Sequence, residues 1–92
     1  PEFIFMDLQI SELTPELQSK FGLSFSSKGL IVLDPGRIAS RLSLRKGDLL
    51  REINRKPVNT IEDAVSAISS IKSSGSITII RSGRRVSLRF RL

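Results

Sequence analysis

Short stretches of alternating or uniformly apolar residues, separated by turn-forming residues, run through most of this 92-residue chain. Leu8 and Ile10 alternate with polar neighbours, which is the period-two pattern of a half-buried strand. The apolar residues at 3–6 are interpreted as a loop that leads into this strand. Residues 30–33 are apolar without alternation, as expected for a central strand that is covered on both faces. The pattern therefore predicts a chain built mainly of short strands.

Two helices are predicted from their capping residues. Thr14 followed by Pro15 is typical of a helix start, and the residues after them predict a short helix over 16–21. Thr60 is a second candidate N-cap, and it begins the main helix, which is expected over 61–71. Two acidic residues lie in the first turn of that helix, where the positive end of the helix dipole stabilises negative charge. One further helical turn is expected over 38–42.

Three more strands are predicted in the second half of the chain. Residues 49–53 form the first, after a Gly-Asp pair that reverses the chain. Residues 76–81 and 84–92 form the other two, joined by a hairpin turn at Ser82 and Gly83, and Gly75 ends the segment before them. Five to six short strands and two helices predict a mainly β fold with helices (α+β), a partly open β-barrel or sandwich capped by the helices.

The composition narrows the functions open to this chain. It has no cysteine and no histidine, which excludes Ser-His-Asp and Cys-His catalysis and a histidine zinc site within these residues, and we expect no cofactor. A chain of this length supports one domain over residues 1–92, because it buries little more than about 60% of its unfolded surface. Residues 1–3 resemble a cloning remnant. No apolar run approaches the roughly 20 residues that cross a bilayer.

The net charge of +6 is concentrated near the end of the chain. The last strand region contains Arg81, Arg84, Arg85, Arg89 and Arg91. Arg89 and Arg91 alternate with apolar residues, so we interpret them as the solvated face of a sheet. A basic surface also attracts nucleic acid, lipid head groups or acidic proteins. Nucleic acid is disfavoured because the chain has no Trp or Tyr to stack on bases, and membrane contact stays open.

Four motifs in the middle of the chain occur in a fixed order. They read GLIV at 29–32, DPG at 34–36, LRKGDLL at 44–50 and INRKPV at 53–58. Together with Ala39 these motifs resemble the PDZ domain in its bacterial, circularly permuted form, and the resemblance spans nearly the whole chain. The resemblance implies a PDZ-like fold and a domain that binds peptides.

The segment before these motifs narrows the resemblance. It reads ISELTPEL at 10–17 and FGL at 21–23, which is similar to the start of the second, C-terminal PDZ domain of HtrA/Deg serine proteases. This resemblance implies a regulatory module of a periplasmic or cell-envelope protein, whose trypsin-like catalytic domain would lie upstream. Its partners would be peptides or segments of unfolded proteins, and other domains or subunits of the parent protease. PDZ domains of secretion systems or intramembrane proteases are the alternatives within the family.

Physical roles can be assigned to the motif residues. Gly36 and Gly47 suit positive φ or close chain approach, and Asp48 can accept backbone N–H groups within its turn. The sequence departs from the family pattern at Ser43, where glycine is usual, and at Arg55, where the family has Asn-Gly. If Arg55 keeps the left-handed conformation it carries about 1 kcal/mol of strain, and otherwise the turn is of another type.

The resemblance implies that a peptide adds as an extra strand to an exposed sheet edge. The family's carboxylate-binding loop falls on Phe5, Met6, Asp7 and Leu8, whose backbone N–H groups would receive the terminal carboxylate of the peptide. The groove would lie between the edge strand at 8–11 and the helix at 61–71. Its residues would be Leu8, Gln9, Ile10, Ser11, Ile61, Val65 and Ile68, and Met6 would join Leu8, Ile10, Val65 and Ile68 in the pocket for the last side chain.

Two residues of this expected site bear on the ligand. Asp7 replaces the second glycine of the loop, and its charge would repel a terminal carboxylate unless a cation offsets it. Weak C-terminal recognition or a preference for internal segments would follow. Ile61 stands where some PDZ domains use histidine, so we expect an apolar ligand residue opposite it.

Three alternatives compete with peptide binding. The groove residues could be plain core residues of a β-rich domain, the domain could mediate assembly with a neighbouring protease or PDZ domain, or the basic last strand could bind anions. Glu62 and Asp63 diverge by about 100° around the helix, so we interpret them as helix-start charges rather than as an acid–base pair.

Overall fold

Seven strands and three helices are present in the computed structural model, which describes residues 2–5, 7–24 and 26–91. The strands are β1 (Glu2–Phe5), β2 (Leu8–Glu12), β3 (Leu30–Asp34), β4 (Leu49–Ile53), β5 (Lys56–Pro57), β6 (Ser74–Arg81) and β7 (Arg84–Arg91). The helices are α1 (Pro15–Lys20), α2 (Gly36–Arg41) and α3 (Ile61–Ser69). Within these described ranges, no helix has the length and apolar character needed to span a membrane.

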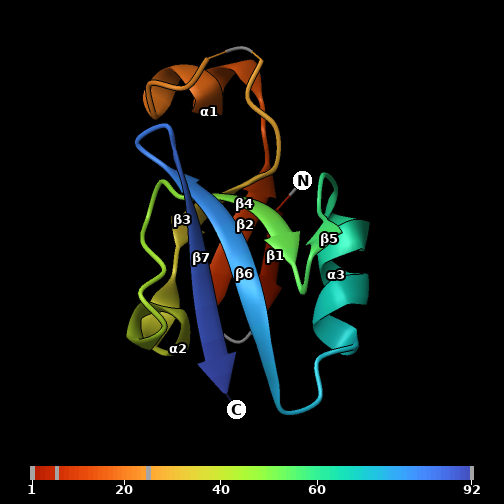
Figure 1. Cartoon of the computed structure of the whole chain (residues 1–92). Coiled ribbons are helices and arrows are strands. Elements are labelled where there is room, and N and C mark those ends of the chain that lie inside the picture. The colour runs from red at the N-terminus through yellow and green to blue at the C-terminus, as the bar shows by residue number, and fades with distance from the viewer. Residues whose placement is uncertain (1, 6, 25, 92) are drawn as a thin grey trace.

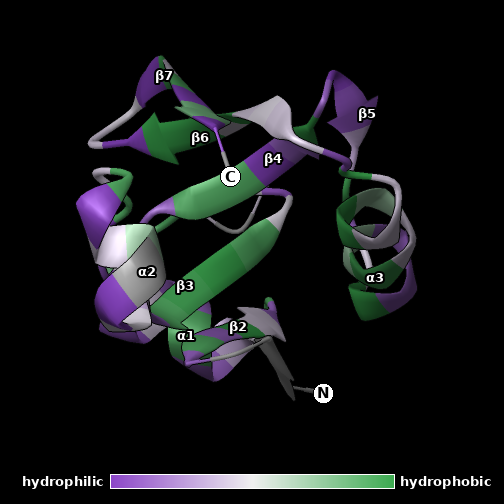
Figure 2. Cartoon of the chain, turned by 90° about the horizontal axis from the view of Figure 1, so that it is seen from below, coloured by the Kyte–Doolittle hydropathy of each residue, from purple (hydrophilic) through white to green (hydrophobic). Residues whose placement is uncertain are grey.

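All the strands belong to one antiparallel sheet. Its order is β1-β2-β3-β4-β6-β7, and β5 pairs with β4 beside this path. The β1–β2 hairpin lies at one end of this order and the β6–β7 hairpin at the other, while α2 and α3 lie on opposite sides of the molecule and contribute to one core (Figures 1 and 2). The predicted mainly β, open PDZ-like fold is confirmed. A third helix, α2, replaces the single helical turn that was expected over 38–42.

Both predicted N-caps are observed. Thr14 Oγ1 accepts the Leu17 N–H at 3.2 Å at the start of α1. Thr60 Oγ1 accepts the Asp63 N–H at 3.1 Å, and Asp63 Oδ2 accepts the Thr60 N–H at 3.2 Å. This reciprocal pair is a capping box, and it satisfies two N–H groups that have no partner within the helix.

Two element ends differ from the prediction. α3 ends at Ser69 rather than 71, because the Ser70 N–H bonds to the Ala67 carbonyl at 3.2 Å and tightens the last turn. β6 begins at Ser74 and includes Gly75, which was expected to end the preceding segment. Turn-forming residues in the sequence predict where a helix or strand ends to within one or two residues, but they do not identify its last residue.

The core is filled by β2, β3, β4 and β6 together with α2 and α3. Its buried members include Ile10, Leu30, Val32, Ala39, Leu50, Ile53, Val58, Ala64, Ala67 and Ile79. Figure 2 shows the hydrophobic stretches of β3 and β4 at the centre of the molecule. The first three residues of β3 have no exposed surface, which confirms the prediction of a strand covered on both faces. This packing fixes the positions of β2 and α3, which are the two walls of the expected groove.

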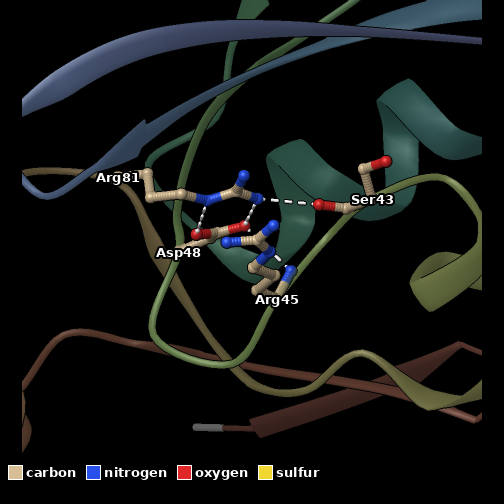
Figure 3. A network of polar contacts seen from close by, with 4 residues as sticks. All are labelled: Ser43, Arg45, Asp48 and Arg81. Atoms are coloured by element: carbon tan, nitrogen blue, oxygen red, sulfur yellow. Dashed lines mark hydrogen bonds and ion pairs between the residues drawn. The ribbon is translucent and has the colours of Figure 1, made fainter.

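Asp48 closes the turn that precedes β4. Its Oδ2 accepts the Arg45 N–H at 2.9 Å, as predicted, and Gly47 has a φ of 90°. The same carboxylate receives two bonds from Arg81 in β6, from Nε at 2.9 Å and from Nη2 at 2.7 Å (Figure 3). Arg81 Nη2 also donates to the Ser43 carbonyl at 2.7 Å. The hydrogen bonds to Asp48 raise the pKa of Arg81, and the network fastens this turn to the end of β6.

Both departures from the family pattern keep the left-handed backbone. φ is 73° at Ser43, 51° at Asn54 and 68° at Arg55. Two successive positive values are those of a type I′ turn, so Arg55 adopts the strained conformation. Asn54 Oδ1 accepts the Ser76 N–H at 2.9 Å, which holds this turn beside β6.

Candidate functional site

The two walls of the expected groove are joined by Glu12. Glu12 is the last residue of β2, and its Oε2 accepts the Ile61 N–H at 3.0 Å in the first turn of α3. A carboxylate at this end of a helix accepts a hydrogen bond from an N–H group that has no partner within the helix. Its negative charge is also stabilised by the positive end of the helix dipole. The two residues are 49 positions apart, and no local pattern pairs them, so sequence reasoning missed this contact.

Asp63 reinforces the same helix start. Its Oδ2 accepts the Asn59 N–H at 3.0 Å in addition to the Thr60 N–H. These bonds, above all the one from Asn59, lower the pKa of the Asp63 carboxyl below its ordinary value of 3.8. The predicted helix-start role of Asp63 is confirmed.

The outer side of α3 carries the apolar residues predicted for the groove. Ala64 and Ala67 are buried in the core, whereas Ile61 and Ile68 are half-buried and pack against its margin. Val65 keeps 39% of its surface exposed. Among the residues that the structure describes, it is the large apolar residue that is classed as exposed. Because residues three and four apart share a helix face, Val65 forms a continuous apolar surface with the two isoleucines.

β2 presents fewer accessible side chains than predicted. Ile10 has no exposed surface and belongs to the core, and Ser11 is buried, with its hydroxyl donating to the Glu12 carbonyl at 2.9 Å. Leu8 and Gln9 are half-buried. Ile10 and Ser11 therefore contribute backbone to this wall, whereas Leu8 and Gln9 also keep accessible side-chain surface.

The edge of β2 that was predicted to be free is covered by the chain itself. β1 pairs with β2 in the antiparallel sense, with Glu2 opposite Ser11 and Phe5 opposite Leu8. The predictions of an exposed edge at 8–11 and of a loop at 3–5 are therefore wrong. The three apolar residues at 3–5 have high β propensity, and two residues separate them from β2, so little chain entropy is lost on pairing.

Asp7 lies between β1 and β2 and bonds to the start of α2. Its Oδ2 accepts the Arg37 N–H at 2.9 Å, beside Asp34, whose Oδ1 accepts the Gly36 N–H at 2.9 Å. Gly36 has a φ of 71°, and a Cβ on it would overlap the Asp7 carboxyl group. The glycine thus permits the close approach that engages the charge of Asp7 with a backbone N–H group.

The remaining residues of the expected carboxylate-binding loop are placed in part. Phe5 is the last residue of β1 and Leu8 is the first residue of β2. Met6 lies outside the described residues. Binding of a terminal carboxylate by the backbone of this loop stays a prediction.

Relatives of known name were found by sequence and by structure, although no family model matches the chain. A probable periplasmic serine endoprotease, DegP-like, of Chlamydia pneumoniae is 26% identical over 78 residues, which are 83% of this chain and 16% of that protein. The solved HtrA-type protease AlgW with decapeptide matches with a TM-score of 0.83 at 23% identity, over 98% of this chain and 29% of that one. This chain has the fold of a PDZ domain and is similar to the PDZ domains of HtrA-type proteases.

The HtrA3 PDZ domain, solved with a phage-derived ligand, matches this chain with a TM-score of 0.73 at 18% identity. That match covers 99% of this chain and 84% of the other, so the two domains have nearly the same extent. The chain spans about a sixth of the length of the curated relative. Its described residues contain no group of three side chains placed to hold a metal ion.

Proposed function

We propose that this PDZ domain binds extended peptide segments by strand addition to β2, in the place that β1 occupies. The observation that carries the proposal is the ladder between β1 and β2, in which β2 accepts an extended antiparallel segment on the side away from β3. Main-chain hydrogen bonds supply the affinity in strand addition, and any peptide that extends can offer them. β1 is therefore a stand-in, within the same chain, for the proposed ligand.

The direction of β1 gives the polarity of the proposed ligand. β1 runs from Glu2, opposite Ser11, to Phe5, opposite Leu8, and so ends beside Asp7. A peptide that replaced β1 in the same direction would bring its C-terminal residue to that loop. This is the polarity that recognition of a terminal carboxylate by backbone N–H groups requires.

Side chains on the two walls give the proposed ligand preference. Ile61, Val65 and Ile68 offer apolar surface along α3, and Leu8 offers it at the loop end of β2. Apolar ligand residues would lose water on binding there, at a gain of about 25 cal/mol per Å² buried. Asp7 would oppose a terminal carboxylate, so C-terminal recognition is weak and internal extended segments are also bound.

The parent protein is proposed to be a trypsin-like serine endoprotease of the HtrA type in the periplasm or cell envelope. The support is that the curated relatives are named as periplasmic serine endoproteases. In this proposal the domain selects exposed segments of unfolded proteins and contacts other domains or subunits of the protease. Solved relatives that hold a decapeptide or a phage-derived ligand support a peptide as the bound molecule.

A second candidate function is assembly, with the groove closed by the chain itself. The observation that favours it is that β2 already has partners on both of its sides. Deleting the domain from the full-length protein would then change the size of the oligomer. Unchanged oligomers with altered substrate selection would favour peptide binding instead.

Peptide titration followed by NMR tests the leading proposal. Peptides with apolar C-terminal residues should bind with dissociation constants in the micromolar range, and the shifts should follow β2 and α3. Val65→Glu places a charge in the apolar surface and should abolish binding. Ser66→Glu adds the same charge on an exposed position about 100° around the helix and should leave binding intact. If no peptide in a library binds either the whole domain or a form that lacks residues 1–4, the proposal is overturned.

A further inference from the structure

A hollow of about 700 Å³ lies beside the β6–β7 hairpin, at the end of the sheet order away from β2. Its lining comes from the Asn54–Arg55 turn, the start of β6 and the end of β7. Arg55, Arg89 and Arg91 line it together with Ser74 and Ser76. In the ladder, Ser76 lies opposite Arg89 and Ser74 lies opposite Arg91, so small residues separate the turn from the arginine row.

The three arginines of this hollow differ from two neighbouring ones. Arg81 is paired with Asp48, and Arg85 is paired with Glu52 at 3.1 Å. Arg55, Arg89 and Arg91 are exposed, and no ion pair joins any of them to another described residue. The described residues that line the hollow include three arginines and no carboxylate, so the lining has a net positive charge.

Arg55 lies at a backbone position that favours glycine. Its φ of 68° follows one of 51° at Asn54, and a residue with a Cβ is strained in this region. Two bonds fix the turn, from the Asn54 N–H to the Ser76 carbonyl at 2.8 Å and from the Ser76 N–H to Asn54 Oδ1 at 2.9 Å. A strained residue with a long cationic side chain, held beside a basic strand, indicates a role for the side chain itself.

Gly75 lets the Asn54 turn and Phe90 pack closely against β6 beside the hollow. A Cβ on it would overlap Asn54 Oδ1 and would lie 2.7 Å from Phe90 Cζ. Phe90 is 9% exposed. The place of the turn beside β6 therefore depends on a glycine that the β propensity of the strand does not favour.

We propose that this hollow is a binding site for a phosphate group, held by Arg55, Arg89 and Arg91. A phosphate dianion offers three strong acceptor oxygens, and guanidinium groups bind such oxygens in pairs, so a hollow lined by three arginines has the charge and the donor groups to bind one. Arginines on β7 also keep this edge strand from pairing with other chains. That role accounts for Arg84, but it does not account for an arginine at a strained turn outside the strand.

The site is independent of the peptide groove. β7 is the end of the sheet order opposite β1 and β2, so a ligand in the hollow does not occupy the groove. Bases of a nucleic acid would have no stacking partner in the hollow, because its one aromatic ring, Phe90, is buried. A compact oxyanion is thus favoured over a nucleic-acid strand.

The test is titration of the labelled domain with inorganic pyrophosphate at low salt, followed by NMR. Amide shifts should concentrate at residues 54–55, 74–76 and 89–91. Arg89→Gln and Arg91→Gln should each weaken binding about tenfold. Arg55→Gly should weaken it by a similar factor while the domain stays folded, because glycine tolerates the positive φ. Arg84→Gln removes the same charge from the other end of β7 and should leave the affinity unchanged.

A second arm separates a free phosphate from a lipid head group. Vesicles of phosphatidylcholine with phosphatidic acid, compared with phosphatidylcholine alone, should bind through the same three arginines if the phosphate belongs to a lipid. Pyrophosphate binding without vesicle binding would assign the site to a soluble phosphate. An equal loss of pyrophosphate affinity in Arg84→Gln and in the three site variants would show general charge attraction and overturn the site. A hexaglutamate peptide that binds as tightly as pyrophosphate would also overturn it.

Discussion

Asp48 and Arg81 form an ion pair with two hydrogen bonds, from Nε to Oδ1 at 2.9 Å and from Nη2 to Oδ2 at 2.7 Å (Figure 3). The Asp48 side chain is 3% exposed and that of Arg81 is 24% exposed. The pair joins the turn before β4 to the end of β6, which are 33 residues apart in the chain. The aspartate of the Gly-Asp motif therefore serves the tertiary structure as well as its own turn.

Arg81→Ala should destabilise the domain by about 3 kcal/mol, because it leaves a buried carboxylate without its charged partner. Urea unfolding followed by circular dichroism measures this loss. Arg85→Ala is the matched control, since its pair with Glu52 has side chains that are 60% and 26% exposed and should contribute less than about 1 kcal/mol. Equal losses of unfolding free energy in Arg81→Ala and Arg85→Ala would contradict the larger contribution assigned to the buried pair.

The stability of α3 should fall in acid because of Asp63. Hydrogen bonds lower the pKa of its carboxyl in the folded state below 3.8, so its contribution is present above that pH and is lost as the pH falls through the folded pKa. Urea midpoints between about pH 2 and pH 6 should decline less steeply in Asp63→Asn than in the parent chain. Glu62→Gln alters a neighbouring carboxylate that accepts none of these bonds, and it should keep the parent slope.

Removing residues 1–4, which takes away most of β1 and keeps Phe5 of the expected loop, should raise the affinity for peptides. β1 and the ligand compete for the edge of β2, so a chain without β1 no longer spends part of the binding free energy on displacing it. The expected gain is about tenfold if β1 covers the edge nine-tenths of the time. Isothermal titration of the same peptide against both chains measures it. An unchanged affinity would mean that peptides bind elsewhere than on β2.

Asp7→Gly should strengthen the binding of peptides with a free C-terminus by about fivefold, because it removes a negative charge near the expected carboxylate position. Asp7→Asn removes the charge but keeps an oxygen for the Arg37 N–H, and it should show most of the gain. Fluorescence titration with free and amidated forms of one peptide checks the cause. A gain of the same size for the amidated peptide would contradict the charge argument.

Local signals predicted the scaffold of this domain well. Thr14, Thr60 and Asp63 act as caps because capping depends on residues within one helical turn. The turn at Ser82 and Gly83 was found for the same reason, since two residues of suitable conformation close a hairpin. The motifs from 29 to 58 then supplied the order of the elements through family resemblance.

Contacts between distant segments could not be read from the sequence. The bond from the Ile61 N–H to Glu12 joins a strand end to a helix start. The sequence around either residue gives no indication that the other is its partner. The apolar residues at 3–5 are compatible with a loop, a core segment or a strand, so the pairing of β1 with β2 depended on which edge was open. Ile10 was assigned to the groove through the family resemblance, and the alternation in β2 identifies a buried face without saying what covers it.

The bond between Glu12 and Ile61 also fixes where the groove can widen. It ties β2 to α3 at the Glu12 end of the strand, where α3 begins. A ligand that forces the walls apart should therefore rotate α3 about the Glu12 end, with the largest displacement near Ile68. Bulky ligand side chains would be accommodated at the end of the groove nearest the loop. At the Glu12 end the distance between β2 and α3 would stay constant and would limit the size of the ligand side chain there.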